Sequence, residues 1–222
     1  MKTTLMVITD GRAECLARTI DSLRQMVKGD IAHKLLIDDS CKSNYAAWLI
    51  CRFSDFEILH TVPKQGFCGA IQTAWAAIKK RYPDTDFLMH LEDDFIFNRQ
   101  VNVAELVEVL QSNPSLAQIA LKRQPWNPAE EKAGGIVEMW PDLYQDRNFE
   151  DYHWLEHRLF FTTNPSMYPK KITEFGWPGP PACEQAFTET LKNAGYSFAY
   201  WGKRSDLPWV YHIGNERVGC GY

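Results

Sequence analysis

Short apolar runs alternate with stretches of helical periodicity over the first 121 residues, and this alternation constrains the fold most strongly. The apolar runs lie at 5–8, 34–37, 56–59, 87–91 and 116–121, and each has the length of a buried strand. Apolar residues recur at helical spacing over 13–27 and again after residues 70 and 102, while 45–52 fits a short helix. Strands that alternate with helices predict βαβ units and a largely parallel sheet, which is an α/β fold.

Three consecutive acidic residues, Glu92, Asp93 and Asp94, follow the apolar run at 87–91. Neighbouring carboxylates repel one another unless positive charge lies between them, and hard divalent cations bind carboxylate oxygens. A metal site is therefore one interpretation of the triplet, and a solvated turn after a strand is the other.

Polar residues also follow three other predicted strands, at 9–12, 38–40 and 64–66. In a parallel sheet the carboxyl ends of the strands share one edge, and ligands gather outside that edge. Four polar clusters at one edge favour a ligand-binding site over four unrelated turns.

The second half of the chain differs from the first in composition and in the order of its expected elements. Residues 126–135 form a connection rich in Pro, Ala and Gly. The elements expected after it are strands at 136–140, 158–163 and 196–201, and a helix at 182–193 that ends at Gly195. A length of 222 residues predicts a single domain over 1–222, in which this half supplies specificity to a site that begins in the first half.

Composition and charge argue against several classes of protein. The net charge of −4 weakens the case for nucleic acid or an anionic membrane as partner. The six cysteines are scattered without a Cys-x-x-Cys pair, so we expect reduced thiols rather than a zinc site or a disulfide framework. The apolar N-terminal run is too short for a signal-peptide core, and no stretch approaches the length of a membrane span. These features predict a cytoplasmic protein with no transmembrane segment.

The polar clusters, in their order along the chain, resemble the motifs of nucleotide-sugar glycosyltransferases of the GT-A fold, glycosyltransferase family two especially. The resemblance covers residues 3–98 well and the remainder more loosely. The matching elements are the opening strand with Thr9-Asp10-Gly11-Arg12, then Ile37-Asp38-Asp39-Ser40, Gly66-Phe67-Cys68-Gly69-Ala70 and Glu92-Asp93-Asp94. The family implies a Rossmann-like, mostly parallel sheet flanked by helices, with a C-terminal elaboration that binds the acceptor.

The resemblance also implies that residues 1–98 bind the nucleotide. Within them, Asp39 matches the residue that accepts a hydrogen bond from a base N–H, and Gly66 and Gly69 would let the backbone approach the nucleotide closely. Asp93 serves either as a contact or as scaffold. The full set expected around the nucleotide is Thr9, Asp10, Gly11, Arg12, Asp38, Asp39, Gly66, Gly69, Glu92 and Asp93.

A divalent cation, Mn2+ or Mg2+, is the cofactor that the family implies. Held by one or two carboxylates and by phosphate oxygens, such an ion acts as a Lewis acid on the leaving diphosphate. Asp94 matches the family's metal ligand. Glu92 departs from the family's aspartate at the first acidic position, which meets either ribose or metal. His212 resembles the late histidine that completes the coordination, although a lone histidine after an apolar pair also suits a structural role.

Glu184 is the candidate catalytic base that the resemblance implies, because an inverting transferase must deprotonate its acceptor. It stands after the Trp- and Gly-bearing segment 177–183, where the family carries a Glu-Asp pair, but here Gln185 replaces the second acid. The alternative role is that of an acid favoured at a helix N-terminus, in which case a retaining mechanism gains support. The glycine-rich tail 214–222 is expected to act as a lid.

The function predicted by the resemblance is metal-dependent transfer of a sugar from a nucleoside-diphosphate sugar, in the first place a UDP-sugar. Residues 99–222 would bind the acceptor, which is a glycan, a protein, a small molecule or a modified nucleic-acid base. One alternative is a nucleotidyltransferase, although no Gly-rich phosphate loop with a trailing lysine follows the first strand. Another is a metal-dependent nuclease or phosphodiesterase built on Glu92, Asp94 and His212, and a third is a nucleotide-binding module without activity.

Overall fold

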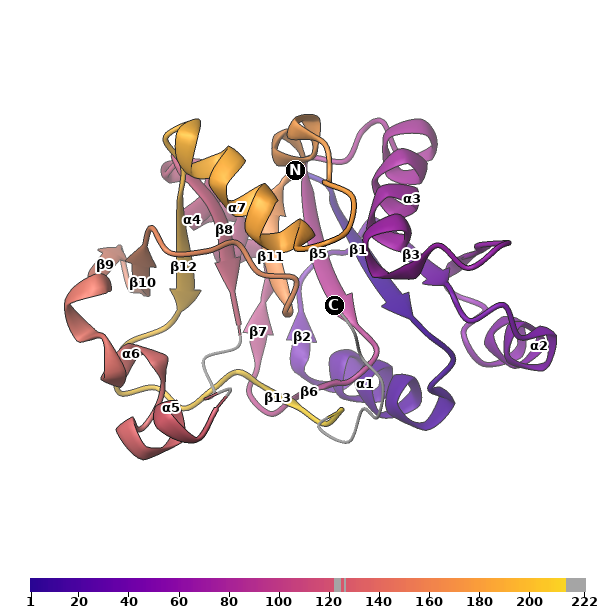
Figure 1. The fold of residues 1–222 in the computed structure, drawn as a ribbon, viewed down its shortest axis with the longest axis horizontal. Coiled ribbons are helices and arrows are strands. Elements are labelled where there is room, and N and C mark those ends of the chain that lie inside the picture. The colour runs from indigo at the N-terminus through magenta and orange to yellow at the C-terminus, as the bar shows by residue number, and fades with distance from the viewer. Residues whose placement is uncertain (122–124, 126, 215–222) are drawn as a thin grey trace.

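A nine-stranded sheet forms the centre of this computed structural model, which describes residues 1–121, 125 and 127–214 (Figure 1). The strand order is β4-β3-β1-β5-β11-β8-β12-β10-β9. Both halves of the chain contribute strands to this one sheet, which confirms the α/β fold expected from the alternation of strands and helices.

The first half supplies four neighbouring parallel strands, and these bring the predicted polar clusters together. The first strand of the chain pairs with a neighbour on each side: Thr9 lies opposite Asp38 on one, and Ile8 lies opposite Glu92 on the other. The ends of these strands therefore meet at one edge of the sheet. The four strands are β1 (Thr3–Thr9), β3 (His33–Asp38), β4 (Glu57–His60) and β5 (Phe87–Glu92).

The second half continues the sheet with mixed strand directions. Strand β11 (Ser166–Pro169) is antiparallel to both β5 and β8 (Leu116–Ala120). Strand β12 (Ser197–Trp201) is parallel to β8, and an antiparallel pair closes the edge, β10 (Tyr152–His157) with β9 (Gln145–Phe149). The sheet is therefore mostly parallel with antiparallel additions from the C-terminal half.

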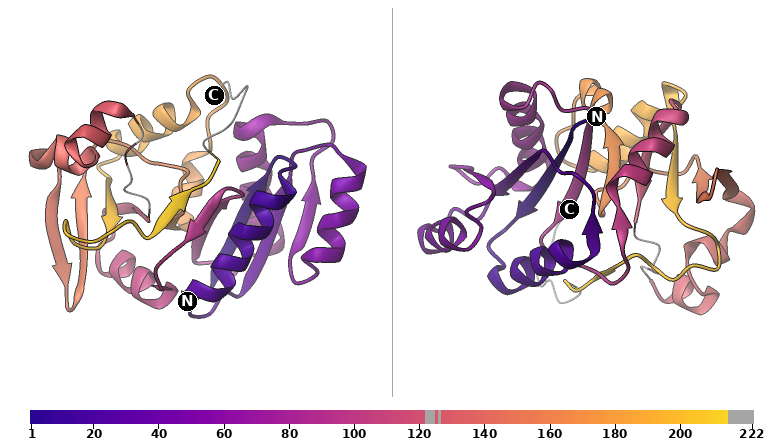
Figure 2. Two further views of the ribbon diagram at one scale, coloured as in Figure 1. Left: turned by 90° about the horizontal axis from the view of Figure 1, so that it is seen from below. Right: turned by 180° about the vertical axis from the view of Figure 1, so that it is seen from behind.

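Two short strand pairs lie outside the main sheet. Strand β13 (Val210–His212) is antiparallel to β6 (Phe95–Phe97), as Figure 2 shows for the yellow strand beside its partner. The second pair joins β2 (Val27–Lys28) to β7 (Val101–Asn102). Because His212 is opposite Phe95, the β13–β6 pair carries the late histidine to the end of β5.

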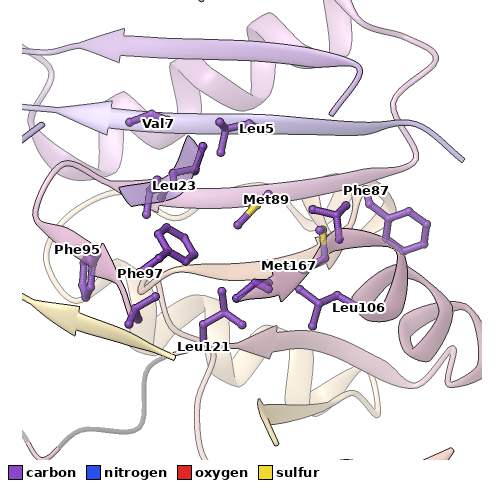
Figure 3. Packing of buried hydrophobic residues seen from close by; sticks show 14 of the residues in the cluster. Leu5, Val7, Leu23, Phe87, Met89, Phe95, Phe97, Leu106, Leu121 and Met167 are labelled. Atoms are coloured by element: carbon purple, nitrogen blue, oxygen red, sulfur yellow. The ribbon is translucent and has the colours of Figure 1, made fainter. Parts of the chain in front are cut away.

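Alternating strand residues feed two large apolar cores, one on each face of the sheet, as expected for side chains that point to opposite faces in turn. Leu5, Val7 and Met89 belong to one core, which extends to Leu106 from α4 at its other side (Figure 3). Met6, Ile8 and Leu88 belong to the other core, with residues of α3 and α7. The helices are α1 (Ala13–Met26), α2 (Ser43–Arg52), α3 (Gly66–Arg81), α4 (Val103–Ser112), α5 (Pro128–Ala133), α6 (Ile136–Met139) and α7 (Cys183–Asn193), with 3₁₀ turns η1 (Pro141–Leu143) and η2 (Lys170–Phe175).

Three local predictions are wrong. Residues 136–140 form the single-turn helix α6 instead of a strand, because a short apolar run does not distinguish the two states. Residues 158–163 are irregular, and the strand lies earlier, at β10. The glycine-bearing segment 63–70 was expected to be a loop before the next helix, but its second part, from Gly66 on, is already the first turn of α3.

A disulfide joins Cys68 to Cys183 across 115 residues of sequence, so the prediction of reduced thiols is wrong for this pair. Cys15, Cys41 and Cys51 are free, and Cys220 lies outside the described residues. Both bonded cysteines are buried, and they tie the first turn of α3 to the first turn of α7. None of the helices in the described chain is long and apolar enough to cross a membrane.

Removing the disulfide is expected to lower the free energy of unfolding by about 4 to 5 kcal/mol, because the bond closes a long loop in the unfolded chain. The measurement is the thermal midpoint of the double variant Cys68→Ala/Cys183→Ala, compared with the unmodified protein with and without a phosphine reductant. Cys15→Ala, which removes a free thiol, is the control. A midpoint that the reductant leaves unchanged would contradict the expectation.

Candidate active site

Asp93 is a buried structural carboxylate that joins β1 and α1 to the end of β5. Its Oδ2 accepts hydrogen bonds from Thr9 Oγ1 at 2.7 Å and from the Asp10 amide at 3.3 Å. Its Oδ1 pairs with the guanidinium of Arg12, and its main-chain oxygen accepts from Thr19 Oγ1 at 2.9 Å. Asp93 has 1% of its surface exposed, and both of its carboxylate oxygens are engaged by neighbouring residues.

Asp94 lies on the other side of the same turn and has one engaged and one unengaged oxygen. Its Oδ2 accepts from Arg12 Nη1 at 2.6 Å and lies 3.0 Å from His212 Nε2. Its Oδ1 is buried without a hydrogen-bond partner within the described chain. Burial opposes ionisation, but the hydrogen bonds and charges of His212 and Arg12 outweigh it and lower the pKa of Asp94 below its usual value. Asp94 is therefore an ionised carboxylate whose Oδ1 can still accept a ligand contact.

Glu92 has the opposite electrostatic character. Burial, together with the nearby Asp94 and Glu184 carboxylates, raises the pKa of Glu92 to about 8, although a hydrogen bond with Thr163 opposes the rise. Glu92 therefore holds its proton at neutral pH as long as no cation adjoins it. A cation at Asp94 would favour the ionised form of Glu92.

Glu184 lies in the first turn of α7, where the positive end of the helix dipole favours a carboxylate. Its Oε1 accepts from both the amide and the hydroxyl of Thr163, at 2.7 Å and 2.8 Å. The helix position predicted from the sequence is thus confirmed, and the side chain is held in a defined orientation.

One pocket of about 1030 Å³ brings the chemistry-bearing side chains together. Glu92 and Asp94 from the end of β5 lie in its wall with His212 from β13, Gly66 from α3 and Glu184 from α7. An apolar wall adjoins them, and its residues are Phe67, Phe95, Ile136, Leu159, Phe160, Phe161, Pro180 and Ala182. A few acidic groups in a largely apolar wall are typical of a site that orients a polar substrate.

The remaining residues expected around the nucleotide lie outside the wall of this pocket, on the adjoining strand ends. Asp39 Oδ1 accepts from the Gln65 amide at 2.7 Å, so it links β3 to the pocket residue Gln65. Asp38 accepts from the Ser40 amide and lies 2.9 Å from His60 Nδ1. The residues outside the wall are Thr9, Asp10, Gly11, Arg12, Asp38, Asp39, Gly69 and Asp93.

The three glycines of the predicted motifs have different roles. Gly11 has φ +88°, and a Cβ there would lie 2.9 Å from the Cβ of Ser40, so the turn after β1 requires glycine. Gly66 also has positive φ and has open space around its Cα. Gly69 is helical, and its missing Cβ makes room for the side chain of Gln65 instead of a ligand. Of the two glycines expected to admit the nucleotide, only Gly66 faces the pocket.

The residues fit a divalent cation that arrives together with a diphosphate. Within residues 1–121, 125 and 127–214, no three His, Cys, Asp or Glu side chains form a ready metal site. Asp94 and His212 alone offer two ligands, and Mg2+ or Mn2+ is commonly held by one or two carboxylates with phosphate oxygens and water. The unpartnered Asp94 Oδ1 supplies one such ligand atom. Gly214 packs closely against the other oxygen, since a Cβ there would lie 2.0 Å from Asp94 Oδ2.

Two features of the site were absent from the sequence-based prediction. Thr163, which binds Glu184, lies in a segment predicted as a strand and carries no motif of its own. Gly214 was assigned to the tail and was given no role at the site. Its position directly after His212-Ile213 is the sequence signal that could have pointed to it. The rest of the predicted lid, residues 215–222, lies outside the described residues.

No protein-family model and no curated protein matches the sequence. Solved structures do match. GalNAc-T7 with UDP, GalNAc and Mn2+ aligns with a TM-score of 0.61 at 10% identity, over 90% of this chain and 42% of that chain. Two structures of S. aureus TarS 1-349, the second in complex with UDP-GlcNAc, align with TM-scores of 0.62 and 0.59 at 13% and 14% identity. They cover 96% and 98% of this chain and 60% and 62% of those chains.

Both of these proteins are glycosyltransferases of the GT-A fold. At such low identities the likeness establishes the fold and leaves the activity to be argued from the site. This chain has the GT-A fold, and it spans less than two thirds of the length of the solved chains that it matches.

Proposed function

We propose that the protein is a metal-dependent glycosyltransferase that takes its sugar from a nucleoside-diphosphate sugar, specifically a UDP-sugar. The observation that carries the proposal is the shared pocket of Asp94 and Glu184 at the carboxyl edge of a GT-A sheet. Support also comes from the structural neighbours, of which one contains UDP, GalNAc and Mn2+ and another UDP-GlcNAc.

In this proposal the donor nucleotide lies along the ends of β1, β3 and β5, within residues 1–98. Asp39 faces the base, and Thr9, Asp10, Gly11, Arg12 and Asp38 shape that side of the site. Arg12 contributes in a second way, because its guanidinium neutralises Asp93 and one oxygen of Asp94. Gly66 then lets the backbone of α3 approach the donor.

Asp94 and His212 would hold Mn2+ or Mg2+, with Glu92 beside them at the metal or at the ribose. When bound, the ion would act as a Lewis acid that stabilises negative charge on the leaving diphosphate. The ionised Asp94 is ready to bind a cation, whereas Glu92 binds it only after losing its proton.

Glu184 is the proposed base. Its carboxylate accepts the proton of the acceptor hydroxyl as the sugar is transferred, which fits an inverting reaction. Residues 99–222 bind the acceptor, and the apolar wall around Leu159 and Phe160 belongs to that part of the pocket. The proposal leaves the acceptor open among a glycan, a protein, a small molecule and a modified nucleic-acid base.

Nucleotide binding is expected to raise the thermal midpoint of unfolding, and Mn2+ should be required for most of the rise. A ligand at 100 times its dissociation constant stabilises the folded state by about 2.7 kcal/mol. The measurement compares UDP, GDP and CDP, each with Mn2+ and with EDTA, and UDP with Mn2+ should give the largest shift. If no nucleotide shifts the midpoint in the presence of Mn2+, the transferase proposal fails.

A further inference from the structure

The irregular segment between β10 and β11 is held in place by hydrogen bonds from side chains to its backbone, and not by the backbone of a neighbouring strand. Gln118 Oε1 accepts from the Thr162 amide at 2.9 Å, and Gln118 Nε2 donates to the Thr162 carbonyl at 2.6 Å. The same Nε2 lies 2.8 Å from Ser166 Oγ on β11. Gln118 has 1% of its surface exposed, so these bonds are made away from water and fix the backbone at Thr162.

The segment is also bonded to α7. The Phe161 amide donates to Thr188 Oγ1 at 2.9 Å, and Thr188 Oγ1 donates to the Glu184 carbonyl at 2.8 Å. The backbone that directly precedes Thr163 is therefore tied to β8 at Thr162 and to α7 at Phe161. The backbone next to position 163 is consequently fixed, and the side chain of Thr163 lies beside α7.

From this position Thr163 makes two hydrogen bonds to one oxygen of Glu184. Its amide and its hydroxyl both donate to Oε1, its side chain also hydrogen-bonds Glu92, and Thr163 itself has 5% of its surface exposed. Hydrogen bonds to an ionised carboxylate are roughly twice as strong as neutral ones. Two of them on one oxygen fix the rotation of the carboxylate and leave Oε2, within the described chain, as the oxygen available to a substrate.

We propose that Thr163 is a positioning residue for the Glu184 base, an inference that rests on the proposed transferase function. Glu184 is only partly buried, and a glutamate in such a place samples several rotamers unless something restrains it. Misplacing a catalytic group by a small distance lowers the rate of the chemical step while binding of the donor continues. The role of Thr163 is thus to keep Oε2 on the acceptor side of the pocket, and its hydroxyl is the part that a substitution can remove.

The test compares Thr163→Val, which keeps the shape and the amide donor, with Thr163→Ser, which keeps the hydroxyl. The probe is UDP release from UDP-GlcNAc and UDP-GalNAc in Mn2+, with water as the acceptor, together with UDP affinity by titration. Thr163→Val should lower kcat by about 10- to 100-fold and leave KM and UDP affinity within about twofold. Thr163→Ser should recover most of the rate. Thr190→Val, which removes an exposed hydroxyl from α7, the helix that carries Glu184, should match the unmodified protein.

A double-mutant cycle gives a second readout that needs no turnover. If Thr163 holds Glu184 in place, the thermal shifts of Thr163→Val and Glu184→Ala should add up to more than the shift of the double variant, since the alanine removes the oxygen that accepts both hydrogen bonds. Additive shifts would overturn the inference, as would normal kcat in Thr163→Val or equal losses in the Val and Ser variants.

Failure of the proposed function has a different signature. In that case the unmodified protein would neither bind UDP nor release it from either donor, and the inference would fall with it. An active enzyme that needs Glu184 but tolerates Thr163→Val would overturn only the positioning role.

Discussion

Replacing Asp94 with asparagine is expected to lower turnover of the sugar donor by about 1000-fold and to remove the Mn2+-dependent part of UDP binding. The amide keeps the shape of the side chain but loses the charge that a divalent cation requires. It also loses the attraction that holds Arg12 and His212 around Oδ2. Turnover is measured as UDP release, and metal dependence as the difference in UDP affinity between Mn2+ and EDTA.

Asp93→Asn is the matched control, since it makes the same change one residue earlier. Asp93 is buried and paired with Arg12, so its loss should lower the free energy of unfolding by about 3 kcal/mol. The difference in UDP affinity between Mn2+ and EDTA should persist in this variant. If Asp94→Asn kept that difference and Asp93→Asn lost it, the division of the triplet into ligand and scaffold would be reversed.

Glu184→Gln is expected to lower kcat by about 100- to 10,000-fold with UDP affinity unchanged, because general-base catalysis contributes to the transition state and not to nucleotide binding. The glutamine still accepts hydrogen bonds from Thr163, so the fold around α7 should be preserved. The measurement is kcat and KM for the donor, with UDP titrated separately.

Glu189→Gln is the control for this prediction. Glu189 lies in the wall of the same pocket and on the same helix, but it pairs with Lys192 at 2.9 Å and is exposed to solvent. Its substitution should change kcat by less than about threefold. Turnover of Glu184→Gln at the level of the unmodified protein would remove Glu184 as the base and favour a retaining mechanism.

The sheet edge that carries the site was predictable because local patterns determine it. Each strand of the first half is a compact apolar run, and polar residues follow directly, so parallel pairing had to bring Asp38 and Glu92 close to Thr9. The acidic triplet shows the limit of such reasoning. Its sequence does not reveal that Asp93 is neutralised by Arg12 while Asp94 keeps an unpartnered oxygen, because that difference depends on tertiary contacts.

The second half was less predictable for a physical reason. The segment at 158–163, with Leu159, Phe160 and Phe161 in it, was predicted as a strand, but the side chains of Gln118 and Thr188 bind its backbone at Thr162 and Phe161. Such long-range bonds leave no periodic signal in the sequence. The disulfide between Cys68 and Cys183 was missed for the same reason, since 115 residues separate the two cysteines.

The most direct test of the central claim is UDP release from a panel of UDP-sugars by the unmodified protein, with Mn2+ and with EDTA. We predict release from at least one donor with Mn2+, loss of that release in EDTA, and loss in Asp94→Asn. A protein that binds UDP but releases none from any donor would be a nucleotide-binding module. Release that is equally fast in EDTA would contradict the metal-dependent transferase.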